Sequence, residues 1–158
     1  MTLAAALGRA PAWFEGEELA LPALDPRRVV LLGVRSLDPH ERTFLRDSDI
    51  RVFTMSDIDR VGIEGAMREA LDRVAGPGFV HLSFDLDALD PEVAPGVGTP
   101  VPGGLTYREA HLACELFAES GMVGSFEFVE SNPILDRANA TAATAVDLIA
   151  SALGQRIL

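Results

Sequence analysis

Cysteine, tryptophan and tyrosine each occur once in this 158-residue sequence, and basic residues are scarce. With Cys114 as the only cysteine, the chain can form no intrachain disulfide, and we expect a cytoplasmic protein. Thirteen Lys and Arg against 24 Asp and Glu leave a net charge of −11, which argues against a nucleic-acid partner because phosphate binding needs clustered basic side chains. No run of about 18 apolar residues occurs, so we expect no membrane-spanning helix.

The composition is that of an ordinary globular domain, with 48% hydrophobic and 23% charged residues. A chain of this size buries roughly 70% of the surface that its unfolded form exposes, which is enough for a real core. Strand-like segments alternate with helix-like segments along the whole sequence. This alternation predicts an α/β fold in which helices cover both faces of a parallel sheet.

Four apolar segments predict the strands, at residues 28–34, 50–55, 79–84 and 122–129. Helices are expected at about 40–47, from Ser56 to Val74, after Thr106, and at about 139–153. Ser56 is the expected N-cap of the second helix, and Thr106 with Glu109 has the pattern of a capping box. In such folds the chemistry lies at the carboxyl ends of the strands, so those ends are where functional side chains are expected.

Two aspartates follow the third predicted strand. If that strand continues through them, Asp85 and Asp87 lie on the same face, since side chains at i and i+2 do so. Neighbouring carboxylates resist ionisation unless positive charge lies between them, and a hard divalent cation with oxygen preference supplies it. The pair therefore predicts a metal site, with simple capping of the following loop as the alternative.

Another class of enzyme uses the same pattern. Haloacid-dehalogenase-like phosphatases also end a buried strand in Asp-x-Asp, with a nucleophile and a general acid around magnesium. In those enzymes a Thr or Val usually follows the second Asp by two positions, whereas this chain has Leu89 there. The motif also lies past the middle of the chain instead of near its start, which disfavours this interpretation.

Two longer motifs carry a family resemblance. The stretch SFDLDALDPEVAPGVGTPVPGGLTY, residues 83–107, resembles the second metal-binding motif of the arginase and agmatinase (ureohydrolase) family. Its segment from Pro95 to Glu109 is similar to arginases, whereas agmatinases tend to have Gly-Thr-Gly-Thr-Pro-Glu there. SFEFVESNP, residues 125–133, resembles the other C-terminal motif of the family, in its bacterial arginase branch. Residues 33–39 and 56–60 also match arginase-like segments.

The resemblance implies a three-layer arginase-like fold and hydrolysis of L-arginine to L-ornithine and urea at a centre of two Mn²⁺ ions. Asp85 would bridge both ions and Asp87 would bind one of them. Glu130 would hold the substrate guanidinium as the catalytic carboxylate, and Thr99 would line that end of the pocket. The remaining implied contacts are to the α-amino group of arginine, from Asp38 and Glu41.

The resemblance also implies that half of the family's domain is absent. Family members carry an Asp-x-His-x-Asp motif, a further histidine ligand and a His-Gly motif, none of which occurs in residues 1–158. We therefore expect the C-terminal portion of a single arginase-like domain, incomplete at its N-terminal side, with an exposed sheet edge. We expect weak manganese binding and little activity from this chain alone.

Two alternatives stay open at this point. The chain could derive from an agmatinase or another ureohydrolase, although Asp38 and Val101 favour arginine as the substrate. It could also be a non-catalytic subunit that associates with a full-length copy, since the family forms trimers or hexamers.

Overall fold

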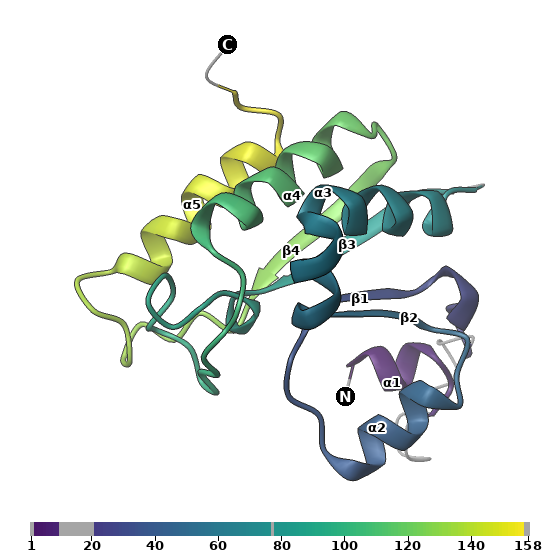
Figure 1. Ribbon diagram of the computed structural model, residues 1–158. Coiled ribbons are helices and arrows are strands. Elements are labelled where there is room, and N and C mark those ends of the chain that lie inside the picture. The colour runs from purple at the N-terminus through teal and green to yellow at the C-terminus, as the bar shows by residue number, and fades with distance from the viewer. Residues whose placement is uncertain (1, 10–20, 77, 157–158) are drawn as a thin grey trace.

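The structure is a computed structural model that describes residues 2–9, 21–76 and 78–156 (Figure 1). The helices and strands alternate as the sequence predicts, and each strand lies within two residues of its expected bounds at either end. The α-helices are α1 (Thr2–Ala6), α2 (Pro39–Arg46), α3 (Met55–Val74), α4 (Tyr107–Glu119) and α5 (Ala140–Ala152). The strands are β1 (Val30–Val34), β2 (Arg51–Thr54), β3 (Val80–Asp85) and β4 (Val123–Val129), and two 3₁₀ turns, η2 (Pro26–Arg28) and η3 (Leu86–Ala88), complete the order.

Capping boxes begin three of the helices. The predicted box at α4 is confirmed, because Thr106 and Glu109 cap each other's backbone amides. At α3 the expected N-cap, Ser56, is wrong. Thr54 caps this helix instead and forms the box with Asp57, so the helix begins two residues nearer to β2 than a Ser56 cap would place it. Helix α3 is also interrupted at Gly62, whose φ of 73° is not helical.

The four strands form two separate parallel pairs, β1–β2 and β3–β4. The predicted parallel pairing is confirmed. The sequence also predicts one sheet, whereas the described strands form two separate ladders. In Figure 1, α3 lies on one side of β1–β2, and α1 and α2 lie on the other. Three layers are therefore present around this pair. Each of the four described strands has only one hydrogen-bonded partner strand and keeps an open edge.

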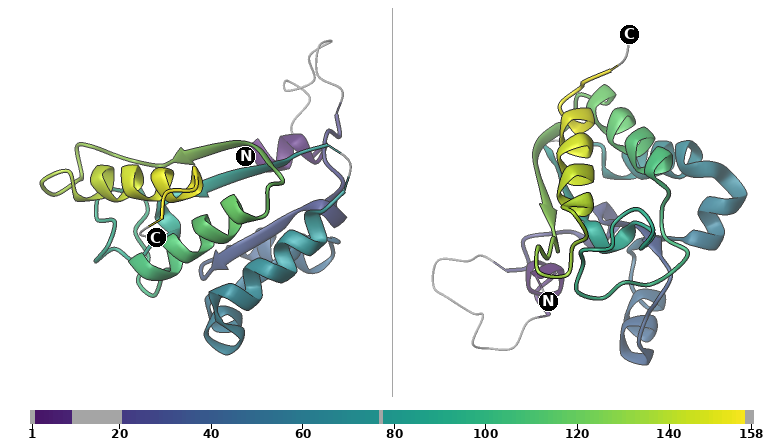
Figure 2. Two further views of the ribbon diagram at one scale, coloured as in Figure 1. Left: turned by 90° about the horizontal axis from the view of Figure 1, so that it is seen from above. Right: turned by 90° about the vertical axis from the view of Figure 1, so that its left-hand side faces the viewer.

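The β3–β4 pair has one apolar face and one polar face. Phe84 and Phe128 stack at 5.0 Å between ring centroids on the face that packs against the main core. Helices α4 and α5 cover this side, as the view from above in Figure 2 shows. On the opposite face, Ser83 donates to Glu127 at 2.9 Å and His81 lies 2.8 Å from the Ser125 hydroxyl. The described residues leave this second face polar and accessible.

Two clusters of buried side chains hold these layers together. The main cluster joins α3, α4 and α5 to β3 and includes Phe53, Ile58 and Leu148, each at most 1% exposed. The smaller cluster, built around Val29 and Ile50, packs α1 and α2 against the other face of β1–β2. In the part of the chain that the structure describes, no helix has the length and apolar character needed to cross a membrane.

Candidate active site at the end of the third strand

The two predicted metal-binding aspartates lie on different elements. Asp85 is the last residue of β3, whereas Asp87 belongs to η3. The expectation that both project from one strand face is therefore wrong, because the strand ends at Asp85 and the chain turns there. The Asp85 carboxylate accepts the amide of Asp87 at 2.8 Å and so begins this turn. The turn still keeps the two carboxylates close enough to influence each other's charge.

Asp87 has one satisfied and one unsatisfied carboxylate oxygen. Its Oδ2 accepts a hydrogen bond from the Thr99 hydroxyl at 2.5 Å. Its Oδ1 is buried and has no hydrogen-bond partner among the described residues. A buried carboxylate oxygen without a hydrogen-bond partner is costly, and binding a cation would offset that cost. The chemistry of this oxygen fits a cation ligand.

Glu130 is brought to the same place by the neighbouring strand. It directly follows β4 and has a φ of 67°, a left-handed conformation that non-glycine residues rarely adopt. Residues held in this region cluster at functional sites, where the surrounding structure compensates for the strain. A Cβ atom on Gly98 would lie 3.8 Å from Glu130 Oε2, so the loop that carries Thr99 passes beside this carboxylate.

The electrostatics of this corner favour a bound cation. Partial burial raises the pKa of the Asp85 carboxyl above its usual value, and the negative charges of Asp87 and Glu130 raise it further. The hydrogen bond from the Asp87 amide and the charge of Arg35 oppose this rise. The negative charges of Asp87 and Glu130 thus act on Asp85, and a divalent ion would relieve this repulsion.

Hydrogen bonds join the beginning and the end of the loop between η3 and α4. The Asp90 carboxylate accepts the amides of Glu92 at 2.9 Å, Gly103 at 2.8 Å and Gly104 at 3.3 Å. These hydrogen bonds lower the pKa of Asp90, the bond from Glu92 most of all. The backbones at the two ends of the loop also pair, through a bridge between Leu89 and Leu105. Nothing in the sequence singled out Asp90 beyond its place in the motif, although an Asp-Pro step at a strand end is typical of turns.

Helix α5 fixes the middle of this loop. The amide of Gly96 donates to the hydroxyl of Thr141 at 2.7 Å, and Thr141 is fully buried. The carbonyl of Gly96 accepts the amide of Asn132, and Val97 bridges Ser131. The loop is therefore tied to the segment that immediately follows Glu130, which sets where Thr99 and Glu130 lie relative to each other.

The two residues predicted to meet the α-amino group lie at the start of α2. Asp38 is the N-cap of α2 and forms a capping box with Glu41. The Oδ1 atom of Asp38 accepts the amides of His40 and Glu41, and the bond from Glu41 lowers the pKa of Asp38. Their own hydrogen bonds lie within the start of α2, three residues beyond Arg35, whose guanidinium donates to the carbonyl of Asp87.

The described residues do not include a group of three or more histidine, cysteine, aspartate or glutamate side chains placed to hold a metal ion. Asp85 and Asp87 could thus supply two carboxylate ligands to a metal ion, and further ligands would be needed to complete its coordination. The histidines do not supply the rest. His81 lies on the polar face of β3, and His111 is buried on α4, 2.8 Å from the Ser151 hydroxyl. Cys114 is buried in the core, which raises the pKa of its thiol to about 12.

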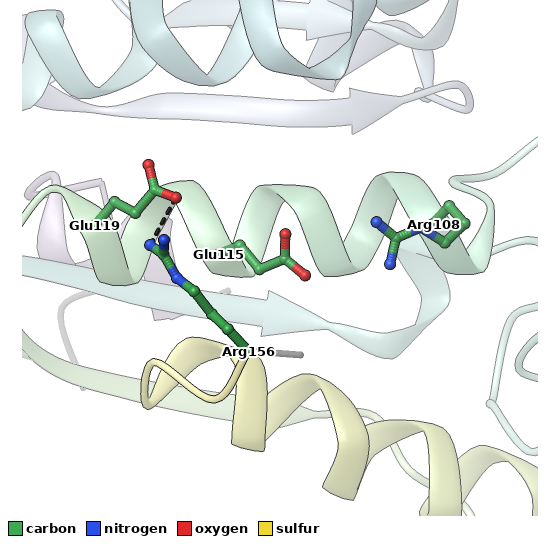
Figure 3. Close-up of a pocket in the computed structure, with 4 residues that line it drawn as sticks. All are labelled: Arg108, Glu115, Glu119 and Arg156. Atoms are coloured by element: carbon green, nitrogen blue, oxygen red, sulfur yellow. Dashed lines mark hydrogen bonds and ion pairs between the residues drawn. The ribbon is translucent and has the colours of Figure 1, made fainter. Parts of the chain in front are cut away.

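One surface depression lies away from these carboxylates. It lies along α4, between Arg108, Glu115, Glu119 and Arg156 (Figure 3). Arg156 and Glu119 form an ion pair of 2.6 Å across it. The depression combines two acidic and two basic side chains on an exposed helix surface, and it contains none of the predicted site residues.

Known proteins resemble this chain over most or all of its length. The Arginase family model matches residues 11–154. The chain is 48% identical to an arginase from Bacillus subtilis over all of its 158 residues, which is 53% of that protein. It is 52% identical to an arginase from Bacillus caldovelox, over 87% of this chain and 46% of that protein. A crystal structure of arginase from Bacillus subtilis superimposes with a TM-score of 0.96, covering 100% of this chain and 56% of the other.

The chain thus spans about half the length of the curated relatives that it matches. Its parallel strand pairs and flanking helices have the arginase fold over that half. The match covers the end of β3, the loop that follows it, and the end of β4. Because the family model matches most of the chain, the chain belongs to the Arginase family.

Proposed function

We propose that this chain carries part of a manganese-dependent site that hydrolyses L-arginine to L-ornithine and urea. The observation that carries the proposal is the buried, unpartnered Oδ1 of Asp87 beside the carboxylates of Asp85 and Glu130. The chain spans about half the length of its relatives, so we propose this activity for a complete protein of which the chain would supply one part.

Asp85 and Asp87 would hold the metal through their carboxylate oxygens, the ligand type that Mn²⁺ prefers. A manganese pair, when bound, would lower the pKa of a coordinated water towards 7 and so supply a nucleophile at neutral pH. The Thr99 hydroxyl would keep Oδ2 of Asp87 in place, which leaves Oδ1 to face the ion.

Glu130 would bind the guanidinium group of the substrate. Guanidinium is planar and always charged, so a fixed carboxylate orients it by charge-assisted hydrogen bonds. The constrained backbone at Glu130 and its contact with the Gly98 segment support a fixed direction for this side chain. Asp38, with Glu41, would meet the α-amino group of arginine from the start of α2.

Arginine is preferred over agmatine because of the loop sequence. Val101 occupies a place where agmatinases favour other residues, and Asp38 offers a charge for the α-amino end. A cytoplasmic location agrees with the single cysteine, which allows no intrachain disulfide. An agmatinase or another ureohydrolase is the alternative within the family.

The activity test is urea release from L-arginine by the purified chain with added Mn²⁺, beside the Bacillus subtilis arginase as positive control. We expect little or no urea, because two carboxylates fall short of the six ligands of an octahedral ion. Urea release at a rate near that of the control, lost in Asp85→Ala, would show that this chain completes the site. Equal release by Asp85→Ala would contradict the assignment of Asp85.

A second candidate is a non-catalytic subunit that associates with a full-length copy. It is favoured by the open edges of both strand pairs and by the incomplete ligand set of the described residues. Size-exclusion chromatography with and without a full-length arginase distinguishes the two candidates, because only a true subunit would co-elute with it.

A further inference from the structure

Arg35 makes an unusual set of contacts for a charged residue. It follows β1 directly and is half-buried. Its Nη2 donates to the carbonyls of Asp87 at 2.6 Å, Leu89 at 3.2 Å and Val101 at 2.6 Å, and its Nε also donates to Val101 at 2.9 Å. The guanidinium fork therefore joins the end of β1 to two separate parts of the loop beyond β3.

These contacts are more numerous than those of the other described arginines that bind backbone carbonyls, since Arg28, Arg51 and Arg73 each donate to a single one. Arg27, Arg51, Arg68 and Arg156 each pair with a carboxylate. Arg35 forms no ion pair with any side chain that the structure describes, and its partners are backbone carbonyls. Carbonyls do not neutralise its charge, so the guanidinium keeps its positive charge beside the loop.

The carbonyls that Arg35 binds belong to segments that carry predicted site residues. One is that of Asp87 itself, and another is that of Val101, two residues beyond Thr99. Asp87 and Thr99 meet through their side chains at 2.5 Å. The guanidinium of Arg35 thus holds the backbone on both sides of the hydrogen bond between Thr99 and Asp87. A planar group with five donors in a fixed arrangement suits this geometry, and a lysine ammonium does not.

We propose that Arg35 is a positioning residue of this site: it fixes the backbone at Asp87 and at Val101, and thereby the direction of the Asp87 carboxylate. The role of Asp87 as a metal ligand rests on the proposed function, whereas the bracing of the loop by Arg35 does not. Arg35 itself is not expected to touch metal or substrate.

Two variants and one control test this proposal. Arg35→Ala removes all the hydrogen bonds, and Arg35→Lys keeps the charge but not the fork. Arg28→Ala is the matched control, because Arg28 also reaches across the fold to a single carbonyl, that of Val74, at 2.9 Å. Amide hydrogen exchange is measured without metal, and paramagnetic broadening of amide signals is then measured with added Mn²⁺.

We expect at least about tenfold faster exchange of amides within residues 86–103 in both Arg35 variants, and no such change in Arg28→Ala. Millimolar guanidinium should partly restore slow exchange in Arg35→Ala and have no effect on Arg35→Lys. Broadening by Mn²⁺ at residues 85–87 should weaken in both Arg35 variants. A general loss of stability would instead speed exchange throughout the chain and would not respond to guanidinium.

Unchanged exchange within residues 86–103 in both variants would overturn the proposal. So would faster exchange with undiminished broadening at Asp87, since Arg35 would then brace the loop without directing the carboxylate. If the unmodified chain shows no localised response to Mn²⁺, the proposed function fails instead, and the exchange data still decide whether Arg35 braces the loop.

Discussion

Replacing Gly104 with alanine is expected to destabilise the chain by about 3 kcal/mol, because the added methyl group meets backbone that cannot move aside. A Cβ atom at this position would lie 2.5 Å from the carbonyl carbon of Leu89 and 2.6 Å from the amide nitrogen of Asp90. That backbone is held in place, since the Asp90 amide donates to Leu105 and the Leu105 amide donates to Ala88. The ladder between the two ends of the loop would have to open.

Thermal unfolding followed by circular dichroism measures this effect. For a chain of this size, a loss of about 3 kcal/mol lowers the Tm by roughly 6–12 °C. Gly103→Ala is the matched control. Its Cβ would meet nothing within 4 Å, so only its positive φ of 79° disfavours the substitution, by about 1 kcal/mol. A loss in Gly104→Ala no larger than in Gly103→Ala would contradict the described closure of the loop.

The second large effect concerns Asp85, whose replacement by asparagine should stabilise the metal-free chain at neutral pH. The folded-state pKa of Asp85 is raised, so its ionised form opposes folding. The favourable contribution of this group is complete below the pKa of the unfolded state and is lost as pH rises through the folded-state value. Asparagine removes the charge and can still accept the Asp87 amide through its side-chain oxygen.

Thermal unfolding of both proteins from pH 3 to pH 7 is the measurement. Asp85→Asn should have the higher Tm at pH 7, and the difference should disappear towards pH 3. Mn²⁺ should raise the Tm of the unmodified chain only, since a ligand stabilises the state that binds it. Asp72→Asn on the exposed surface of α3 controls for the change in net charge. If Asp85→Asn and Asp72→Asn change the Tm equally at every pH, the Asp85 carboxylate is not destabilised by its neighbours.

Local features of the fold could be predicted from the sequence because they depend on neighbouring residues. The capping box of Thr106 and Glu109 depends on a spacing of three residues, and the strands are short apolar segments of ordinary length. Local patterns misled at one helix start. Thr54 and Ser56 are both good N-caps, and each has an aspartate three residues later, Asp57 and Asp59, so the spacing alone does not choose between them.

The geometry of the site depends on contacts between distant residues, which single-sequence patterns do not contain. Strand alternation placed Asp85 and Asp87 on one face, but η3 begins at the strand end and carries Asp87 with it. Arg35 lies in a segment that resembles the family, yet its carbonyl partners are 52 to 66 residues away. The left-handed backbone at Glu130 likewise leaves no local signal in the sequence.

The central claim is that Asp85 and Asp87 hold manganese beside Glu130. The most direct test is an amide NMR spectrum of the ¹⁵N-labelled chain with substoichiometric Mn²⁺, which localises even a weakly bound ion by the signals that it broadens. We predict that signals from residues 85–87, 98–100 and 130–131 broaden first, and that Asp85→Ala abolishes this pattern. Broadening confined to other acidic surfaces, such as Asp57 to Asp59, or a pattern unchanged by Asp85→Ala, would contradict the account.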